Sequence, residues 1–557
     1  MLLLSWALNF SSKAQNSLDV RSQRKKNTDD YAQTMEAISS VLGQVSLYFV
    51  DSVNLSELHV DGINYMLQRL DPYTVYMPKK EAAEFRESTT GNYGGIGAIL
   101  HQRPDSTVII DAPMKGKAAD KAGLQSGDVI LYINGKDFRK TTVAKVRSEL
   151  RGVPGAMLRL QIRRPGVSNP FEVEFARESI EMSPVSLSTM LPGNIGYIRL
   201  ASFMGSAYDD LRKAYEKLSS QGMAMSGLIL DLRDNGGGLM QHAVDIVGMF
   251  VPKNSLVVEL KTRIPGKATR YNTSREPIAP NLPLAVLIDG GSASASEIVA
   301  GALQDYDRAI VVGEKSFGKG LVQSTLSLPD SAILKVTTAH YYIPSGRCIQ
   351  RIQYNHQGGE VDITEQQDSL GQPFYTQNKR VVYAAGGIMP DIKIRPDSIP
   401  STLGSLLLDT LTYDFVTQYV IEHPQTPSIE NFSLTDAQYA AYKDKVLNQK
   451  FKFSSQADAL LARLTQVLQA EGRADILEPA TQKVQELLNN STKILLEKNE
   501  KEIRNYLNMS IIQRYYYSEG ARLYTLPSDN MVNGAANLLR NGSQYQKLLQ
   551  PAQKQKK

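Results

Sequence analysis

The sequence has one cysteine, Cys348, and only six histidines among its 557 residues. A single cysteine excludes an internal disulfide and a zinc site built from several thiolates. Because the histidines are scattered along the chain, a histidine-rich metal site is not expected either. The composition leaves room for a protein that needs neither a disulfide nor such a metal site, and we expect no metal ion or other cofactor.

An excess of charge and long apolar runs are also lacking. The 62 Lys and Arg residues and 57 Asp and Glu residues give a net charge of +5, and no basic block indicates nucleic-acid binding. After the first ten residues, no stretch reaches the ~18 apolar residues of a membrane-spanning helix. We expect neither a nucleic-acid partner nor a membrane span in the mature chain.

Residues 1–16 combine a short apolar run with small residues that could precede a cleavage site, although a basic start is missing. This pattern predicts a signal-peptide-like segment, and the alternative is a short buried N-terminal segment. Removal of a signal peptide would leave a mature protein in the cell envelope. We expect the periplasm of a bacterium.

The remaining composition is that of a soluble globular protein, with 42% hydrophobic and 21% charged residues. At roughly 150 residues per domain, the length predicts about four domains. Hydrophobic spacing suggests a helical domain at 30–87, a β-rich module at 88–180, strand and helix alternation at 181–400, and a helical domain at 401–557. A Gln, Gly and Asp-rich stretch at 351–380 is expected to be a surface excursion.

Short apolar runs place the strands. Runs at 108–110, 129–133 and 158–162 predict strands of the β-rich module, and residues 141–151 predict a helix. In the third segment the runs at 195–200, 227–231, 284–288 and 309–312 are almost continuously apolar. Such runs are typical of strands buried on both faces of a sheet that helices cover.

A serine-rich turn follows one of these buried strands, in Asp289-Gly-Gly-Ser-Ala-Ser-Ala-Ser-Glu-Ile298. A serine at a strand-to-helix turn exposes its hydroxyl near the free N–H groups that begin the helix. This geometry suits a nucleophile beside an oxyanion site. The simpler alternative is that these serines only shape the turn and cap the helix.

A lysine lies between two glycines in Gly313-Glu-Lys-Ser-Phe-Gly-Lys-Gly320. Close backbone packing there could desolvate Lys319 and lower its pKa, as a lysine general base requires, whereas the alternative is a surface lysine in a turn. The segment is not a phosphate loop, because Gly320 stands where Ser or Thr would bind magnesium. A Ser-His-Asp triad through His242 stays open, although that residue fits a helix pattern better.

Several longer motifs occur together in order. They include Leu70-Asp-Pro-Tyr73, Asp231-Leu-Arg-Asp-Asn-Gly-Gly-Gly238, Ser292-Ala-Ser-Ala-Ser-Glu297, Phe317-Gly-Lys-Gly320, Pro344-Ser-Gly-Arg347 and Gly387-Ile-Met-Pro-Asp391. Over roughly residues 30 to 395 the chain resembles the carboxy-terminal processing proteases, the tail-specific serine-lysine peptidases of family S41. The resemblance implies a multidomain α/β protein, with a ClpP/crotonase-like protease core, an inserted PDZ domain, and helical N- and C-terminal domains.

The resemblance also implies roles for individual residues. It makes Ser294 the nucleophile and Lys319 the general base, with Gln323, one helical turn beyond, orienting the lysine amine. The backbone amides of Ala295 and Gly238 would form the oxyanion site. Asp305 matches a motif position, and a structural role near its helix end is expected.

The PDZ-like module would select substrates. Its resemblance implies that the terminal carboxylate of a peptide binds a backbone loop while the peptide adds as an edge strand, at Gly95, Ile96, Gly97, Ala98 and Ile99. Arg151 resembles a position that links peptide binding to alignment of the active site. The expected activity is endoproteolysis of proteins near accessible C-termini, with a homo-oligomer through the helical terminal domains as an expected assembly.

Two other functions stay open. In the first, the chain is a non-catalytic PDZ-type peptide-binding scaffold of the cell envelope, which the intact serine, lysine and glutamine disfavour. In the second, the glycine-rich region belongs to a hydratase-like acyl-CoA fold, but no acidic catalytic pair is visible and an analogy of folds is weak evidence of chemistry.

Overall fold

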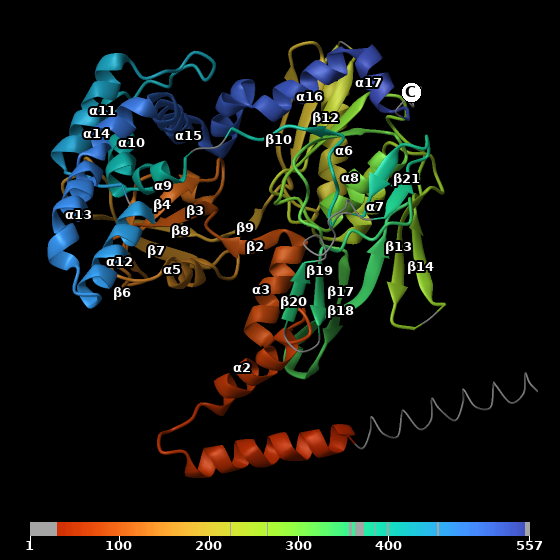
Figure 1. Ribbon diagram of the computed structural model, residues 1–557, viewed down its shortest axis with the longest axis horizontal. Helices are drawn as coiled ribbons and strands as arrows, with labels where there is room; N and C mark the ends of the chain where they lie inside the picture. The colour runs from red at the N-terminus through yellow and green to blue at the C-terminus, as the bar shows by residue number, and fades with distance from the viewer. Residues whose placement is uncertain are drawn as a thin grey trace, which may run out of the picture. The chain divides into compact units, whose positions relative to one another are not determined.

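The computed structural model describes residues 30–222, 224–264, 266–355, 359–362, 372–384, 386–397, 400–453 and 456–551. The segment predicted to be a signal peptide, residues 1–16, lies outside these ranges. The chain divides into two compact units (Figure 1). The first comprises Met1–Ala82, Gln323–Thr337 and Tyr354–Glu360, and the second comprises Ala83–Val322, Thr338–Gln353 and Val361–Lys557.

The first unit contains helices that bury little of their surface. Residues 30–48 are helical, and α2 (Leu55–Gln68) begins where the Asn54 side chain accepts the amide of Ser56 at 3.1 Å. No residue of α2 is buried, and Leu47 and Tyr65 are 74% and 66% exposed. The predicted helical spacing is therefore confirmed, but its apolar side chains remain largely in contact with solvent.

A turn and a short strand complete the first unit. The Asp71 carboxylate accepts the amide of Thr74 at 2.7 Å and its hydroxyl at 3.0 Å, which fixes the turn. Strand β1 (Val75–Met77) then pairs antiparallel with β18 (Ile333–Tyr342), with Val75 opposite Lys335. Strand β17 (Leu321–Ser327) also pairs with β18.

The β-rich module follows helix α3 (Lys79–Thr90). Its sheet has the strand order β3-β4-β5-β7-β8, with β6 beside β5. The elements are β2 (Asn92–Gly95), β3 (Ala98–Gln102), β4 (Val108–Pro113), α4 (Ala118–Lys121), β5 (Val129–Ile133), β6 (Lys136–Asp137), α5 (Val143–Leu150), β7 (Met157–Arg163), β8 (Phe171–Ala176) and β9 (Glu178–Glu181). The three predicted strands and the predicted helix are confirmed, and β3 lies at one edge of the sheet.

Ser294 and Lys319 each follow a strand of a second, six-stranded sheet with the order β10-β11-β12-β15-β16-β23. Its strands are β10 (Val185–Leu191), β11 (Ile195–Leu200), β12 (Gly227–Asp231), β15 (Leu284–Ile288), β16 (Ile310–Gly313) and β23 (Ile392–Lys393). All neighbours run parallel except β10, which is antiparallel to β11. Every residue of β12, β15 and β16 is buried, as the apolar runs predicted.

Helices cover both faces of this sheet. Val286 of β15 belongs to the core shared with α6 (Ala207–Ser219), α7 (Met240–Val247) and α8 (Ala295–Asp305), whereas its neighbour Ala285 faces α16 (Asn530–Arg540) and α17 (Gly542–Leu548). The alternation follows from the two-residue period of a strand. The last helices therefore complete the α/β core, although the sequence placed them in a separate helical domain.

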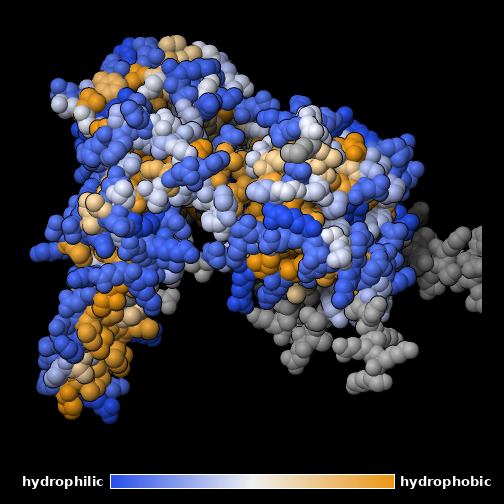
Figure 2. All heavy atoms as spheres, turned by 90° about the horizontal axis from the view of Figure 1, so that it is seen from above, coloured by the Kyte–Doolittle hydropathy of each residue, from blue (hydrophilic) through white to orange (hydrophobic). Residues whose placement is uncertain are grey.

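The other helices after residue 400 are α9 (Ser401–Leu407), α10 (Thr410–Glu422), α11 (Asp436–Asn448), α12 (Gln456–Ala470), α13 (Ala474–Asn489), α14 (Ser491–Lys498) and α15 (Glu500–Thr525). Buried side chains of α9, α10, α11, α14 and α15 share a core of their own, and none of the described residues of that core lies in α12 or α13. Figure 2 shows hydrophobic side chains gathered on a lobe at the left of the molecule, where Figure 1 places α12 and α13. Leu460 and Ile476 of these helices are 66% and 76% exposed.

The stretch predicted as a surface excursion, 351–380, is described only in part. Its strands are β19 (Ile352–Asn355), β20 (Gly359–Asp362) and β21 (Pro373–Tyr375), and β21 pairs with β22 (Val381–Tyr383). The prediction is wrong at the end of the stretch, because Thr376 and Arg380 are buried. The Arg380 guanidinium pairs with Asp307 at 2.5 Å and with Asp391 at 2.6 Å, which ties this stretch to the core.

Strands β13 (Leu256–Thr262) and β14 (Ala268–Asn272) form a hairpin, and β13 pairs with the last residues of β18. This places Tyr341 opposite Leu260. No helix in the described part of the chain combines the length and the apolar character needed to cross a membrane.

Candidate active site

Ser294 lies at the sharp turn between strand β15 and helix α8. Its backbone has φ 56° and ψ −111°, a conformation that is strained for a residue with a side chain. The flanking Ala293 and Ala295 are buried, whereas Ser294 itself is half-buried. The turn thus has the strained character of a nucleophile elbow, although the sequence lacks the usual Gly-x-Ser-x-Gly pattern.

Lys319 lies in the loop between β16 and β17, where the backbone packs closely. A Cβ added to Gly318 would come within 2.6 Å of the Gly386 carbonyl oxygen, and one added to Gly320 within 2.7 Å of the Gln350 nitrogen. Gly318 also has φ 88°, which favours glycine. The predicted close packing around Lys319 is confirmed, and the lysine itself is half-buried.

Glu297, in the first turn of α8, joins these two segments. One oxygen of its carboxylate, Oε2, accepts the amide of Ser294 at 2.8 Å and the amide of Lys319 at 2.9 Å. The other oxygen accepts the Ser316 hydroxyl at 2.6 Å and the Gly318 amide at 2.7 Å. The structure therefore brings the Ser294 and Lys319 backbones together around a single carboxylate.

Burial dominates the electrostatics of Glu297. The residue is fully buried, and desolvation raises the pKa of its carboxyl to about 7, although the four donated hydrogen bonds act in the opposite direction. Glu297 was not among the site residues predicted from the sequence. Its position three residues after Ser294 is the Ser-x-x-Glu spacing of a capping box, a signal that could have identified it.

The predicted oxyanion donors lie beside this turn. A Cβ on Gly237 would lie 2.9 Å from the Ser294 Cβ and 3.0 Å from the Ala295 nitrogen, so the glycine loop contacts the turn at Ser294. The Gly237 amide already donates to the Asn235 side chain at 3.0 Å. Among the described residues, the amides of Ala295 and Gly238 have no hydrogen-bond acceptor, which leaves both N–H groups available.

Gln323 departs from the predicted spacing. The expectation of one helical turn between Lys319 and Gln323 is wrong, because Gln323 belongs to strand β17. Its side-chain amide donates to the Thr337 hydroxyl at 3.1 Å. Its orientation of the lysine amine stays a prediction.

The Ser-His-Asp alternative receives no support. His242 lies in α7, and its Nδ1 atom is buried without a hydrogen-bond partner among the described residues, so no carboxylate orients the ring from that atom. The described residues also contain no group of three or more His, Cys, Asp or Glu side chains that could hold a metal ion.

Asp305 has the structural position expected for it. It lies at the C-terminal end of α8, where its carboxylate pairs with the Arg347 guanidinium at 2.9 Å. Both side chains are 1% exposed. Arg347 also donates to Gln304 at 2.8 Å, so the helix that begins at the nucleophile turn is anchored at its other end.

The residues predicted to bind peptide lie where β2 passes into β3. Gly95 ends β2, and β3 begins at Ala98, as expected for an edge strand. The intervening carbonyls of Ile96 and Gly97 are held by the amides of Ala119 at 2.8 Å and Met114 at 2.9 Å. Ile99 is 42% exposed on β3, so this edge presents an apolar side chain to solvent.

Helix α5 lies beside β3 in this module. The Gln102 side chain links them, since its amide donates to the Thr141 carbonyl at 3.1 Å and its oxygen accepts the Val143 amide at 3.1 Å. At the other end of α5, the Arg151 guanidinium lies 4.9 Å from the centre of the Tyr93 ring and 3.5 Å from the Glu87 carboxylate. Arg151 thus contacts both β2 and α3.

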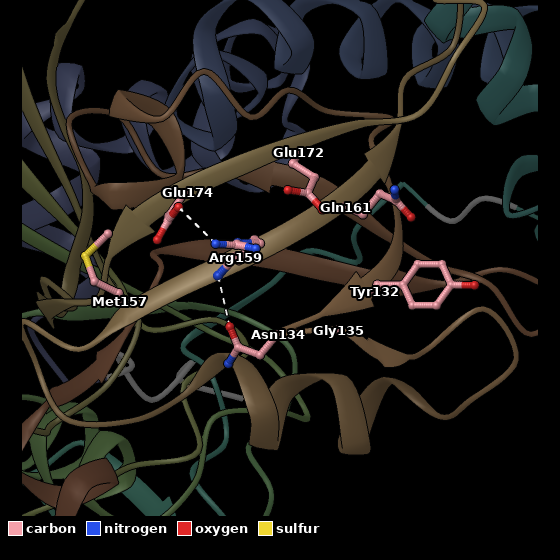
Figure 3. A pocket seen from close by; sticks show the side chains of 8 residues that line it. All are labelled: Tyr132, Asn134, Gly135, Met157, Arg159, Gln161, Glu172 and Glu174. Carbon is pink, nitrogen blue, oxygen red and sulfur yellow. Dashed lines mark hydrogen bonds and ion pairs between the residues drawn. The ribbon is translucent and has the colours of Figure 1, made fainter.

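A concavity of the module lies away from these residues. It has a volume of about 560 Å³ and covers strands β5, β7 and β8, away from the β3 edge (Figure 3). Arg159 lies at its centre, where its side chain approaches Glu174 at 3.7 Å and its amide donates to Asn134 at 3.0 Å. None of the predicted site residues lines it.

Comparison with protein families gives three matches. The family described as "Peptidase family S41" matches residues 194–362, and "PDZ domain" matches residues 86–163. A third family, "Probable PDZ-protease, C-terminal helical domain", matches residues 403–539. The matches follow one another along the chain in the order of the β-rich module, the α/β sheet and the helical segment.

Comparison with individual proteins gives relatives that align with about half of this chain or more. A carboxy-terminal-processing protease of Bartonella bacilliformis is 35% identical over 328 residues, which cover 58% of this chain and 75% of the relative. A carboxyl-terminal-processing protease of Synechocystis sp. is 38% identical over 296 residues, which cover 52% and 68%. The solved structure of a photosystem II D1 C-terminal processing protease is 28% identical, with a TM-score of 0.35, and covers 64% of this chain and 86% of that one.

Proposed function

The chain belongs to the carboxy-terminal-processing proteases of peptidase family S41, and we propose that it is a serine endopeptidase with Ser294 as nucleophile and Lys319 as general base. The observation that carries the proposal is the shared oxygen of Glu297, which accepts the backbone amides of both residues. A buried carboxylate that holds two distant segments in this way fixes the backbone from which both side chains project. The order and direction of the strands support the ClpP/crotonase-like architecture that we propose for this core.

The proposed reaction needs only these side chains, the backbone and water. Neutral Lys319 accepts the Ser294 hydroxyl proton as Oγ attacks the scissile carbonyl, and the resulting ammonium protonates the leaving amine. Water, deprotonated by Lys319, then attacks the acyl-serine ester, the bond between the acyl carbon and Ser294 Oγ breaks, and the Lys319 ammonium returns its proton to Oγ as the new carboxyl terminus leaves. Gln323 would orient the lysine amine.

The amides of Ala295 and Gly238 are the proposed oxyanion donors. Both N–H groups lack an acceptor among the described residues, and Ala295 opens helix α8, where the helix dipole adds positive potential. Each such donor contributes about 3 kcal/mol to stabilisation of the transition state in comparable sites.

The PDZ domain is proposed to bind the substrate C-terminus. The terminal carboxylate would meet the backbone of Gly95, Ile96 and Gly97, and the peptide would extend β3 from Ala98 and Ile99. The open β3 edge and the exposed Ile99 side chain support this assignment.

Arg151 is proposed to connect this domain with the protease core. Its partner Glu87 lies in α3, just before residues that contact the core: the Gly205 amide donates to the Thr89 carbonyl at 3.2 Å. Phe203, two residues before Gly205, forms a β-bridge with Gly238, the proposed oxyanion donor. The contacts form a continuous route from the PDZ domain to the oxyanion site.

A homo-oligomer through the terminal helices is also proposed. The helices at 30–68 and the α12–α13 hairpin expose large apolar side chains, among them Tyr48 at 78% and Leu487 at 60%. Exposed apolar surface of this extent is typical of protein interfaces. Light scattering of the purified protein would give a multiple of the monomer mass, and a strictly monomeric protein would contradict the assembly.

The proposed location is the cell envelope, in the bacterial periplasm, after removal of the signal-peptide-like segment. It is supported by the apolar start of the sequence alone. N-terminal sequencing of the secreted or periplasmic protein would identify the cleavage, and recovery of the uncleaved chain from the cytoplasm would refute it.

The catalytic proposal is tested with Ser294→Ala and Lys319→Ala against a peptide that has a free apolar C-terminus. Both variants should remain folded by circular dichroism and release no fragments detectable by mass spectrometry. Near wild-type turnover in either variant would refute the assigned pair. If the wild-type protein binds the peptide but forms no product, the scaffold alternative holds instead.

A further inference from the structure

Tyr341 contacts the same two backbones as Glu297, but from their carbonyl side. It lies near the end of β18 and is 1% exposed. Its hydroxyl donates to the Lys319 carbonyl oxygen and lies 3.3 Å from the Ser294 carbonyl oxygen. Its own amide donates to the Gly320 carbonyl at 2.9 Å, which fixes the chain next to the lysine.

The two side chains divide the polar groups of the site between them. The Glu297 carboxylate accepts the N–H groups of Ser294 and Lys319, and the Tyr341 hydroxyl faces the C=O groups of the same two residues. A buried side chain therefore contacts the peptide group before and the peptide group after each of Ser294 and Lys319. A shift of about 1 Å at such a site is enough to cost roughly 100-fold in rate.

We propose that Tyr341 is a positioning residue of this protease, whose hydroxyl sets the distance between the nucleophile turn and the lysine loop. The inference rests on the proposed function of Ser294 and Lys319. Tyr341 does not enter the reaction itself. Its ring belongs to the hydrophobic core around α8, while its hydroxyl supplies the contact with the site.

The direct test is Tyr341→Phe, which retains the ring in the core and removes only the hydroxyl. The matched control is Tyr342→Phe on the same strand, because Tyr342 points to the other face, where Lys261 Nζ lies 3.9 Å from its ring centre. The two variants and wild type are compared for kcat and KM with the peptide substrate across a range of pH.

We expect Tyr341→Phe to lower kcat at least tenfold and to change KM less than twofold, whereas Tyr342→Phe behaves like wild type. The acid limb of kcat/KM should also shift, because the proposed general base no longer keeps its position relative to Ser294. A merely structural role would reduce the amount of folded enzyme without moving that limb.

The inference is overturned if Tyr341→Phe retains kcat within twofold of wild type. The inference is also overturned if Tyr341→Phe loses activity only in proportion to its loss of folded protein and keeps the pH profile of wild type. Ser294→Ala in the same assay separates the two failures. Activity in that variant would refute the proposed function, whereas an inactive Ser294→Ala beside a fully active Tyr341→Phe would refute only the role of Tyr341.

Discussion

The protease core and the PDZ domain hold their predicted functional residues in opposite ways. In the core, the backbones of Ser294 and Lys319 are fixed by Glu297 and Tyr341, and both of these side chains are buried. In the PDZ domain, the predicted peptide site is an open strand edge where Ile99 is 42% exposed. If the proposed function holds, we expect changes in the core to act on the rate of chemistry and changes at the PDZ edge to act on binding.

The largest expected effect comes from removing the base in the core. Lys319→Met should lower kcat about 1000-fold or more, because no other group is proposed to take the Ser294 proton. Lys315→Met in the same loop is the matched control and should retain wild-type kinetics. Peptide turnover measures kcat for both variants. An equal loss of kcat in Lys319→Met and Lys315→Met would contradict Lys319 as the general base, because it would show an effect of loop charge or loop folding alone.

Crowding the glycine loop at 236–238, which holds the proposed oxyanion donor Gly238, should have the next largest effect on kcat. In Gly237→Ala the new Cβ would lie 2.7 Å from the Ala293 carbonyl oxygen at a φ of 99°, so the nucleophile turn must shift. We expect kcat to fall about 100-fold. The adjacent Gly236→Ala has nothing within 4 Å of its Cβ and should be nearly silent. A larger loss of kcat in Gly236→Ala than in Gly237→Ala, measured in the same turnover assay, would contradict the close packing of Gly237 against the turn at Ser294.

Glu297 predicts a dependence of stability on pH that belongs to the core alone. In the unfolded chain its carboxyl releases a proton near pH 4.5, whereas burial in the folded protein raises its pKa to about 7. Folding therefore takes up a proton between these values. The stability from this proton is fully present below pH 4.5 and is lost as the pH rises through about 7.

The difference in unfolding free energy between wild type and Glu297→Gln isolates this contribution. We expect wild type to lose about 3 kcal/mol relative to the variant from pH 4.5 to pH 8. Calorimetric unfolding at several pH values measures it. A difference that is constant across this range would show that the folded carboxyl titrates normally.

Changes at the PDZ edge should have the smallest effect and should act on binding. Ile99→Asp should raise KM about fivefold for a peptide with a free apolar C-terminus and leave kcat unchanged, because only the docking strand is altered. Gln161→Ala, in the concavity over β5, β7 and β8 and away from the β3 edge, is the control (Figure 3). A fall in kcat for Ile99→Asp would place the PDZ edge within the catalytic step.

The sequence predicted most strands because buried parallel strands read as continuous apolar runs. The runs at 195–200, 227–231 and 284–288 coincide with β11, β12 and β15. It did not predict that α16 covers one face of this sheet, since an amphipathic helix pattern does not reveal which sheet the helix packs on. Likewise Thr376 and Arg380 are polar and read as surface residues, but long-range ion pairs bury Arg380.

The sequence predicted those residues of the candidate site that belong to local motifs. Ser294 and Lys319 stand out by turn and glycine context, and the structure brings their backbones together. The contact of Glu297 with Lys319 and that of Tyr341 with Ser294 were not predicted, because hydrogen bonds across 22 and 47 residues leave no local pattern. The helical spacing assumed for Gln323 failed for a similar reason, since pairing between β17 and β18 determines its conformation.

The most direct test of the account measures binding and cleavage together in Ser294→Ala. Fluorescence anisotropy gives the affinity for a peptide with a free apolar C-terminus, and mass spectrometry gives the rate of its hydrolysis. We predict an affinity within twofold of wild type and a hydrolysis rate at least 1000-fold lower. Hydrolysis above one tenth of the wild-type rate would contradict Ser294 as the nucleophile and, with it, the division of work between the core and the PDZ domain.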